Sequence, residues 1–241
     1  MRERLDKLLV KKGFANSRET AQRLIQDGKI EINGYVHLKP STLVETDVNI
    51  NKVDDLRYVS RGGLKLESAL SGFGIAATDK VALDIGASTG GFSDCLLQMG
   101  VKKVFAVDVG YGQLAWKIRQ DVRVVVLERI NARYITSQDI PDPIDLAVID
   151  VSFISLKKII PAIVPLLVDD GEVVALFKPQ FEVGRGDVGK GGIVRDEQKR
   201  LKSLNDMIVA FEDFGLKVVD TMESPIKGHD GNVEYFIYAK K

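Results

Sequence analysis

The sequence predicts an α/β fold in which a mostly parallel sheet carries helices on both faces, preceded by a small α+β domain. An apolar, strand-like run that ends in Asp84 passes through a glycine-rich turn, Gly86 to Gly91, into an apolar helix. Strand-like and helix-like segments then alternate, and runs such as Val-Val-Ala-Leu-Phe at 173–177 are typical of strands buried on both faces. Residues 1–52 differ, because they indicate two short helices and a hairpin.

The small domain is predicted to contain a helix, a second helix and a small sheet, in that order. Apolar positions at helical spacing predict a first helix over residues 2–12, which ends at Gly13. The N-cap candidates Asn16-Ser17 start a second helix that ends at Gly28. Asn33-Gly34 is the strongest short hairpin signal, and it is expected to join two strands.

A short polar segment, residues 53–59, predicts a linker to a large domain over residues 60–241. A helix at the start of this domain precedes the alternating elements. Strands are predicted over residues 81–86, 102–108, 122–127, 144–151, 172–178, 217–223 and 233–239, and helices over 92–100, 113–119, 156–167 and 196–214. Residues 179–195 hold five glycines at the carboxyl edge of the predicted sheet, where such a loop is often an active-site lid.

Composition and charge limit the function classes. The 241 residues are 45% hydrophobic and 28% charged, as in ordinary globular chains, and the formal net charge of zero excludes a global attraction to nucleic acid. The first 40 residues, however, hold nine Lys and Arg against five Asp and Glu, which indicates a basic nucleic-acid-binding module. The single cysteine, Cys95, forms no intramolecular disulfide, and neither a signal peptide nor a membrane span is evident. A cytoplasmic protein with no membrane partner is expected.

The glycine-rich turn predicts a ligand site. A dinucleotide motif needs glycine where Ser88 stands, and a nucleoside-triphosphate motif needs lysine where Phe92 stands, so neither fits. Asp84, two positions before Gly86, favours a cationic, phosphate-free ligand such as S-adenosylmethionine; a tight turn without a ligand is the alternative. Asp108 ends the next strand, where doubly wound folds place a carboxylate that binds ribose hydroxyls. The predicted cofactor-binding residues are Asp84, Gly86, Ser88, Thr89, Gly90, Gly91, Asp108 and, after the third strand, Asn131.

Basic side chains recur along the small domain: Arg4, Lys7, Lys11, Lys12, Arg18, Arg23, Lys29 and Lys39. A solvated basic face is the simpler interpretation of scattered charges. Nevertheless, RLDKLLVKKG at 4–13, SRETAQRLIQDGKIEINGYVHLKPS at 17–41 and the stretch from Val44 to Ile50 together closely resemble the S4 RNA-binding domain. The resemblance implies binding to structured RNA, with salt-dependent contacts from these side chains to phosphates.

Six further motifs are SRGGLKLE at 60–67, DIGASTGGFSDCLL at 84–97, VDVGYGQL at 107–114, DVSFISL at 150–156, FKPQFEVGRG at 177–186 and KGGIVRD at 190–196. With them the whole chain resembles the TlyA-type (hemolysin A) branch of the FtsJ-like ribose 2′-O-methyltransferases. The resemblance implies a Rossmann-like S-adenosylmethionine-dependent methyltransferase fold with a seven-stranded sheet, and ribosomal RNA or ribosomal subunits as partners. It also implies a metal-free catalytic tetrad of Lys65, Asp150, Lys178 and Glu234. Little sequence extends beyond the two domains, and this shorter form implies large-subunit RNA, with small-subunit RNA as an additional possibility.

Position alone already indicates two of these residues. Asp150 and Lys178 end predicted strands at the carboxyl edge of the sheet, the usual binding crevice, although either could be merely the first solvated residue. A ribose 2′-hydroxyl must lose its proton and align with the methyl donor, and Lys178 is the candidate base. A free lysine is protonated at neutral pH; a neighbouring Lys65 and partial desolvation favour loss of that proton, whereas Asp150 and Glu234 oppose it.

Two other functions remain open from the sequence. The name hemolysin in the family implies a membrane-lytic protein. The absence of a secretion signal or a membrane span argues against this alternative. The chain could also be an RNA-binding ribosome assembly factor whose methyltransferase fold has no activity. The intact glycine turn and tetrad argue against this alternative.

Overall fold

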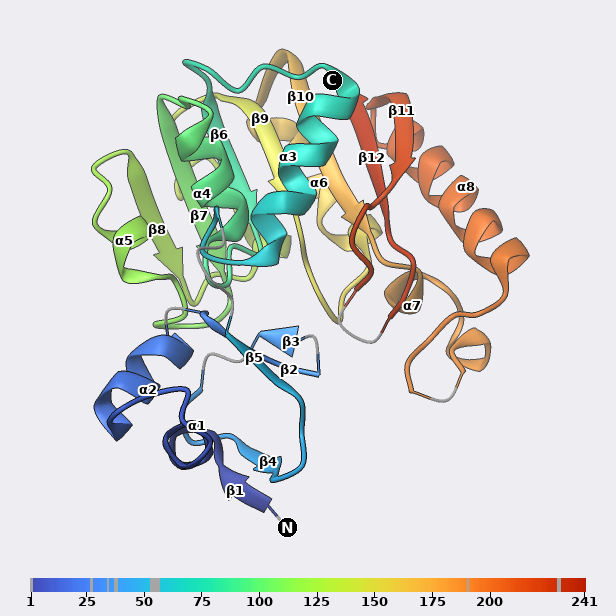
Figure 1. The fold of residues 1–241 in the computed structure, drawn as a ribbon. Helices are drawn as coiled ribbons and strands as arrows, with labels where there is room; N and C mark the ends of the chain where they lie inside the picture. Colours follow the sequence, from blue (N-terminus) through green and yellow to red (C-terminus); the bar gives the residue numbers. More distant parts are fainter. Residues whose placement is uncertain are drawn as a thin grey trace. The chain divides into compact units, whose positions relative to one another are not determined.

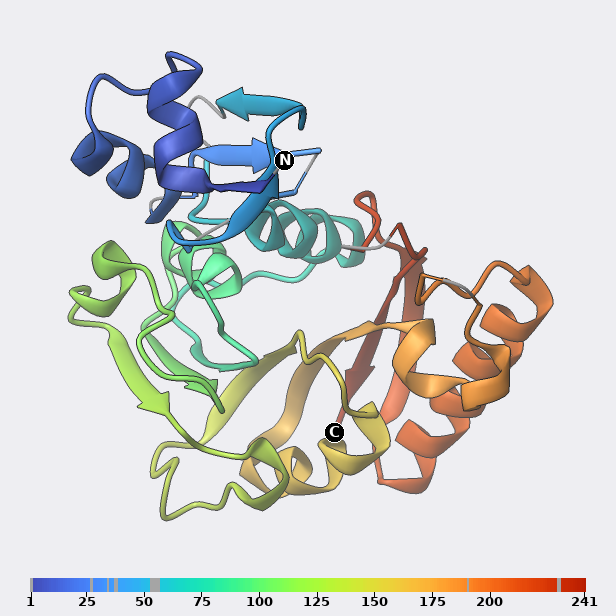
Figure 2. The ribbon, with the colours of Figure 1, turned by 90° about the horizontal axis from the view of Figure 1, so that it is seen from below.

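The computed structural model describes residues 2–26, 28–33, 35–36, 39–52, 57–189, 191–228 and 231–241. The chain divides into two compact units, Met1–Arg61 and Gly62–Lys241, which are drawn in Figures 1 and 2 and are treated separately below. The linker predicted at 53–59 falls at the end of the first unit, and its residues 53–56 lie outside the described residues.

The first unit combines two helices with short antiparallel strands. Its elements are β1 (Arg2–Arg4), α1 (Leu5–Lys11), α2 (Arg18–Gln26), β2 (Ile30–Ile32), β3 (Tyr35–Val36), β4 (Leu43–Glu45) and β5 (Ile50–Lys52). β1 pairs with β4, and β2 lies between β3 and β5. Leu5, Leu8 and Leu9 of α1 pack with Ala21 and Ile25 of α2 in one apolar core, which explains the helical spacing of these residues.

One prediction for this unit is wrong. Residues 2–4 were expected to belong to the first helix, but Arg2 pairs with Glu45 and Arg4 with Leu43 as a strand. The helix begins at Leu5, whose backbone N–H donates to the carbonyl of Thr42 at 2.8 Å. Local spacing could not reveal this strand, because its partner lies about forty residues away.

The predicted helix start and hairpin are confirmed. The hydroxyl of Ser17 accepts the backbone N–H of Thr20 at 3.1 Å, which is the bond of an N-cap. Ile32 pairs with Tyr35 across a two-residue connection, in which Asn33 has a positive φ of 51°. Gly34 lies outside the described residues.

The second unit is a seven-stranded sheet with helices on both faces (Figure 1). After helix α3 (Arg61–Phe73) come β6 (Val81–Ile85), α4 (Gly91–Gln98), β7 (Lys103–Asp108), α5 (Trp116–Arg119), β8 (Val124–Glu128), β9 (Ile144–Ile149), α6 (Ile160–Ile163), β10 (Leu167–Phe177), α7 (Pro179–Glu182), α8 (Glu197–Asp213), β11 (Lys217–Glu223) and β12 (Tyr235–Lys240). The strand order is β11-β12-β10-β9-β6-β7-β8. β12 is antiparallel to both of its neighbours, and the other described pairs are parallel. The predicted fold class is confirmed.

Two helices are shorter than the sequence predicts. The helix expected over 113–119 is a single turn, Trp116–Arg119. The helix expected over 156–167 is a 3₁₀ turn, α6 and a second 3₁₀ turn, Val164–Leu166. Pro161 and Pro165 carry no backbone N–H and so interrupt the helical hydrogen bonds.

The sheet buries both faces and leaves its carboxyl edge open to loops. Ile160 and Ile163 of α6 and Phe211 of α8 share one apolar core with alternate residues of the central strands. Figure 2 shows α3 and α4 on the face opposite to α6 and α8. The turns that follow β6, β7, β9 and β10 therefore meet at one edge, which is where the candidate site lies.

Candidate active site

The turn after β6 brings backbone against backbone. Gly86 has a φ of +85°, and a Cβ atom at this position would lie 2.3 Å from the carbonyl oxygen of Asp150. Gly90 caps α4 with a φ of +92°. Both conformations favour glycine, and the first also excludes any side chain. The glycine turn thus packs directly on the end of β9.

Asp108 closes this turn from the neighbouring strand. One carboxylate oxygen accepts the backbone N–H of Ser88 at 2.8 Å, and the other accepts that of Gly110 at 2.7 Å. Each carboxylate oxygen has a second acceptor site, so the oriented group is still able to accept hydroxyl protons. This geometry fits the ribose-binding role expected of Asp108.

Asp84 is a carboxylate enclosed in the domain. It is fully buried at the end of β6, where Oδ2 accepts the hydroxyl of Ser93 at 2.7 Å and Oδ1 has no hydrogen-bond partner among the described residues. Burial, with a smaller contribution from the charge of Asp150, raises the pKa of Asp84 to about 7. A buried acidic oxygen that lacks a partner fits a cationic ligand at this turn.

We expect the burial of Asp84 to make stability fall as pH rises. Since the native pKa of Asp84, about 7, exceeds the unfolded value of 3.8, the native state binds the extra proton between these two values. The free energy of unfolding should therefore decline from about pH 4 to about pH 7, by roughly 4 kcal/mol from this group. Asp84→Asn should remove that decline, as urea titrations at pH 5 and pH 8 can measure. An equal difference between the two pH values in both proteins would contradict the assignment.

The four residues of the predicted tetrad form two ion pairs. Lys178 Nζ lies 2.6 Å from Asp150 Oδ1 and also contacts the hydroxyl of Ser152 at 3.0 Å. Lys65 Nζ lies 2.6 Å from Glu234 Oε2, and the Glu234 side chain is only 3% exposed. Each lysine thus has a carboxylate of its own, and the positive charge of Lys65 is balanced.

Sheet register brings the two pairs together. Phe177 pairs with Tyr235 at the end of the β10–β12 ladder, so Lys178 and Glu234 occupy the next facing positions. β9 lies on the other side of β10, and Asp150 directly follows it. Lys65 reaches the group from α3, where it is bound to Glu234. The predicted site residues therefore come from four elements and lie at one edge of the sheet.

The remaining cofactor candidates lie in the same turns. Ser88 is exposed with a φ of 47°, Thr89 accepts the backbone N–H of Ala115 with its carbonyl at 3.1 Å, and Gly91 is the buried first residue of α4. Asn131 lies after β8, and its side-chain oxygen accepts the backbone N–H of Arg133 at 3.1 Å. That bond orients Asn131, whose contact with the cofactor stays a prediction.

Sequence reasoning missed three residues that shape the site. Ser152 contacts Lys178, and Asn232 bonds the backbone of Gly192 and Val194, which ties the glycine-rich segment to the residues before β12. Gly228 lies so close to Glu234 that a Cβ atom would be 2.3 Å from its carboxylate. Of these three residues, only Ser152 could have been found from the sequence, because it lies two positions after Asp150.

The glycine-rich segment predicted as a lid contains short helical turns. α7 and a 3₁₀ turn, Arg185–Asp187, follow Lys178 directly. Lys199 of α8 forms an ion pair with Asp187. These contacts anchor the segment beside the site, and its movement as a lid stays a prediction.

The predicted RNA-binding residues belong to the first unit. Lys7, Lys11, Lys12, Arg18, Arg23 and Lys39 are exposed, whereas Arg4 and Lys29 are half-buried. Lys11 contacts Glu3, and Lys12 donates to the carbonyl of Val48 at 3.0 Å. Arg4 and Arg18 share one partner, Asp6.

The described part of the chain shows neither a candidate metal site nor a candidate membrane helix. It holds no cluster of three or more potential metal-ligating side chains, and none of its helices has the length and apolar character needed to cross a bilayer.

Comparison with known proteins gives consistent matches over both units. The family model of the FtsJ-like methyltransferases matches residues 58–241, and that of the S4 domain matches residues 3–50. The chain is 50% identical to a "putative rRNA methyltransferase YqxC" of Bacillus subtilis, over 98% of this chain and 85% of the relative. It is 47% identical to the "16S/23S rRNA (cytidine-2'-O)-methyltransferase TlyA" of Mycobacterium tuberculosis, over 99% of this chain and 90% of the relative. A solved structure of a "putative hemolysin" from Streptococcus thermophilus superposes with a TM-score of 0.78 at 45% identity, over 100% of this chain and 88% of that one.

Proposed function

The chain belongs to the FtsJ-like methyltransferase family and carries an S4 domain, and from that premise we propose that it transfers a methyl group from S-adenosylmethionine to a ribose 2′-hydroxyl of ribosomal RNA. A cytidine is the favoured nucleoside, because the mycobacterial relative is named for it. That name includes both ribosomal RNAs, so small-subunit RNA stands beside the large-subunit RNA favoured from the sequence. The observation that carries the proposal is the direct contact of the glycine turn, at Gly86, with the strand end that supplies Asp150.

The turn residues fit the proposed cofactor. S-adenosylmethionine supplies an activated methyl group on a positively charged sulfur. Asp108 is oriented to accept hydrogen bonds from ribose hydroxyls, and Asp84 provides a buried acidic group on the same turn. A nearby positive charge favours the ionised form of a carboxyl group, so cofactor binding should be accompanied by proton release from Asp84 near neutral pH.

We expect Asp108→Ala to weaken cofactor binding without unfolding the domain. Loss of a charged hydrogen-bond acceptor costs about 1.5 to 3 kcal/mol, which corresponds to a roughly 10- to 150-fold higher Kd. Isothermal titration with S-adenosylmethionine measures this change. Asp121→Ala is the matched control, because Asp121 is a carboxylate that precedes a neighbouring strand and forms an ion pair with Arg123. Equal affinity for the wild type and Asp108→Ala would refute the pocket assignment.

The tetrad suits proton transfer from a hydroxyl. Lys178 is the proposed base, and Asp150 and Ser152 fix its ammonium nitrogen at the sheet edge. Lys65 and Glu234 provide a neutral, largely buried wall beside Lys178. Alignment of donor and acceptor contributes on the order of 7 to 11 kcal/mol in well-oriented reactions.

One experiment tests the function as a whole. Protein-free 16S and 23S RNA and both ribosomal subunits are incubated with methyl-labelled S-adenosylmethionine, and the labelled nucleotide is mapped. Label on a ribose 2′-oxygen supports the proposal, and absence of label from all four substrates contradicts it. Release of dye from liposomes by the purified protein would instead favour the membrane-lytic alternative, and RNA binding without methyl transfer would favour the inactive assembly factor.

A further inference from the structure

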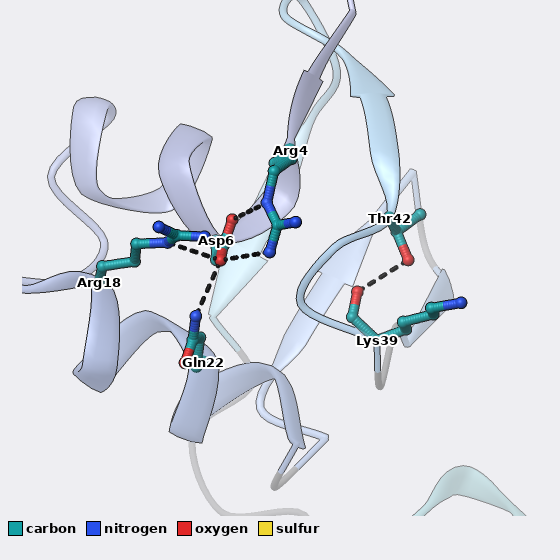
Figure 3. Close-up of polar contacts among 6 residues, drawn as sticks. All are labelled: Arg4, Asp6, Arg18, Gln22, Lys39 and Thr42. Carbon is teal, nitrogen blue, oxygen red and sulfur yellow. Dashed lines mark hydrogen bonds and ion pairs between the residues drawn. The ribbon is translucent and has the colours of Figure 1, made fainter.

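A buried carboxylate of the first unit is bound to two of its basic side chains. Asp6, the second residue of α1, has a side chain that is 0% exposed, although it stands in a sequence of charged residues that suggests a solvated position. Figure 3 shows three side chains converging on it, from β1 and from α2. They are Arg4, Arg18 and Gln22.

The contacts of Asp6 fix both arginines. Arg4 donates from Nε to Oδ1 and from Nη2 to Oδ2, each at 3.0 Å, which is a bidentate pair. Arg18 donates from Nε to Oδ2 at 2.9 Å, and Gln22 donates to the same oxygen at 2.9 Å. The bonds to Asp6 leave further N–H groups on both guanidinium groups. The side chains of Arg4 and Arg18 are 37% and 51% exposed, so part of each arginine faces solvent.

The charge of this cluster is unbalanced. A single arginine would neutralise one buried carboxylate, yet two surround Asp6, so the group carries one excess positive charge on its exposed side. The hydrogen bonds from Arg4 in particular hold the pKa of Asp6 well below its usual range, so the carboxylate stays ionised at any working pH. A fixed pair of guanidinium groups with net positive charge is suited to a phosphate oxygen.

We propose that Asp6 is a positioning residue for RNA binding, which holds the guanidinium groups of Arg4 and Arg18 in place as one preformed site for an RNA phosphate. The inference rests on the proposed function, which places RNA on this unit. Free arginine side chains lose rotamer freedom when they bind, whereas side chains held by Asp6 have already lost it. Asp6 itself does not touch the RNA.

Charge and positioning predict opposite results for Asp6→Asn. The substitution adds one positive charge, so electrostatics alone predicts tighter binding to RNA. Loss of the two fixed guanidinium groups predicts weaker binding, by on the order of tenfold for two side chains that must be immobilised on binding. Glu45→Gln is the matched control, because it also removes a carboxylate next to an arginine, Arg2, but at an exposed site.

The binding experiment uses the full-length protein and 23S RNA transcribed in vitro, at several salt concentrations. We expect Asp6→Asn to bind about tenfold more weakly than the wild type, and Glu45→Gln to bind as well as the wild type or better. Affinity of Asp6→Asn equal to or above that of the wild type would overturn the proposal. Thermal unfolding monitored by circular dichroism sets a temperature at which every variant is folded.

A second pair of variants covers the case in which Asp6→Asn does not fold. Arg4→Lys keeps the charge and a partner for Asp6 but loses the planar fork, and Arg2→Lys makes the same change at the exposed pair with Glu45. Weaker binding by Arg4→Lys alone supports the proposal, and equal binding by both variants overturns it.

Methyl transfer by the wild type, measured in the same preparation, separates the proposed function from the proposed role of Asp6. If the wild type neither binds nor methylates RNA, the proposed function fails. If the wild type methylates RNA normally and the variants bind RNA as well as the wild type does, only the role of Asp6 is rejected.

Discussion

Lys178→Ala is expected to abolish methyl transfer and to leave cofactor binding intact. The Lys178 side chain is bound to Asp150 and Ser152 at the end of β10, and neither of these residues belongs to the glycine turn. Removal of a group that transfers a proton typically slows a reaction by about 10² to 10⁴-fold. Single-turnover methylation of ribosomal RNA measures the loss, and isothermal titration with S-adenosylmethionine measures the retained affinity.

Lys217→Ala serves as the control for this variant, because Lys217 is an exposed lysine at the opposite end of the sheet, at the start of β11. It should have wild-type activity. Near-normal turnover by Lys178→Ala, with an unchanged dependence on pH, would mean that another group accepts the proton. Loss of cofactor binding by Lys178→Ala would place the lysine in the cofactor pocket instead.

Removal of residues 1–55 is expected to eliminate RNA binding while cofactor binding persists. The candidate cofactor residues and the tetrad all belong to the second unit, Gly62–Lys241, whose apolar core is formed by its own elements. The basic side chains assigned to RNA phosphates are all removed. If about six of them contact phosphates, the slope of log affinity against log salt concentration should become less steep by about five units, at the value of about 0.9 per contact for duplex DNA.

The measurement is a salt titration of 23S RNA binding by the full-length and truncated proteins, between about 50 and about 200 mM salt. Calorimetric titration with S-adenosylmethionine is the control for folding of the truncated protein. If the truncated protein showed the same affinity and slope as the full-length protein, the second unit alone would bind the RNA, and the S4 domain would have only a structural role.

Much of the second unit could be predicted because each central strand is a continuous apolar run. Strands buried on both faces, such as β9 and β10, carry that signal in their own residues. The failures concern elements that depend on distant partners or on breaks. Residues 2–4 form a strand only because β4 pairs with them. The helix predicted over 156–167 is divided by two prolines, although the apolar residues around the prolines have the spacing of a continuous helix.

The site shows the same division. Asp150 and Lys178 could be proposed from position, because each follows a buried strand at the binding edge. Lys65 and Glu234 carry no local signal, since the contact that links them joins residues 169 positions apart, and only the family resemblance identified them. Asp6 was not predicted as a site residue, because an acidic residue in a helix rich in charges is normally exposed. Its burial is evident only from its contacts with Arg4 and Arg18.

The position of β12 has a consequence for the order in which the enzyme is completed during synthesis. β12 lies between β10 and β11, although both of those strands precede it in the chain. While the polypeptide emerges from the ribosome, β11 has no described strand to pair with until β12 arrives. Glu234 immediately precedes β12, so Lys65 has no Glu234 to pair with until this later segment has been synthesised. A nascent chain can therefore form its RNA-binding unit and its glycine turn well before it can assemble the tetrad.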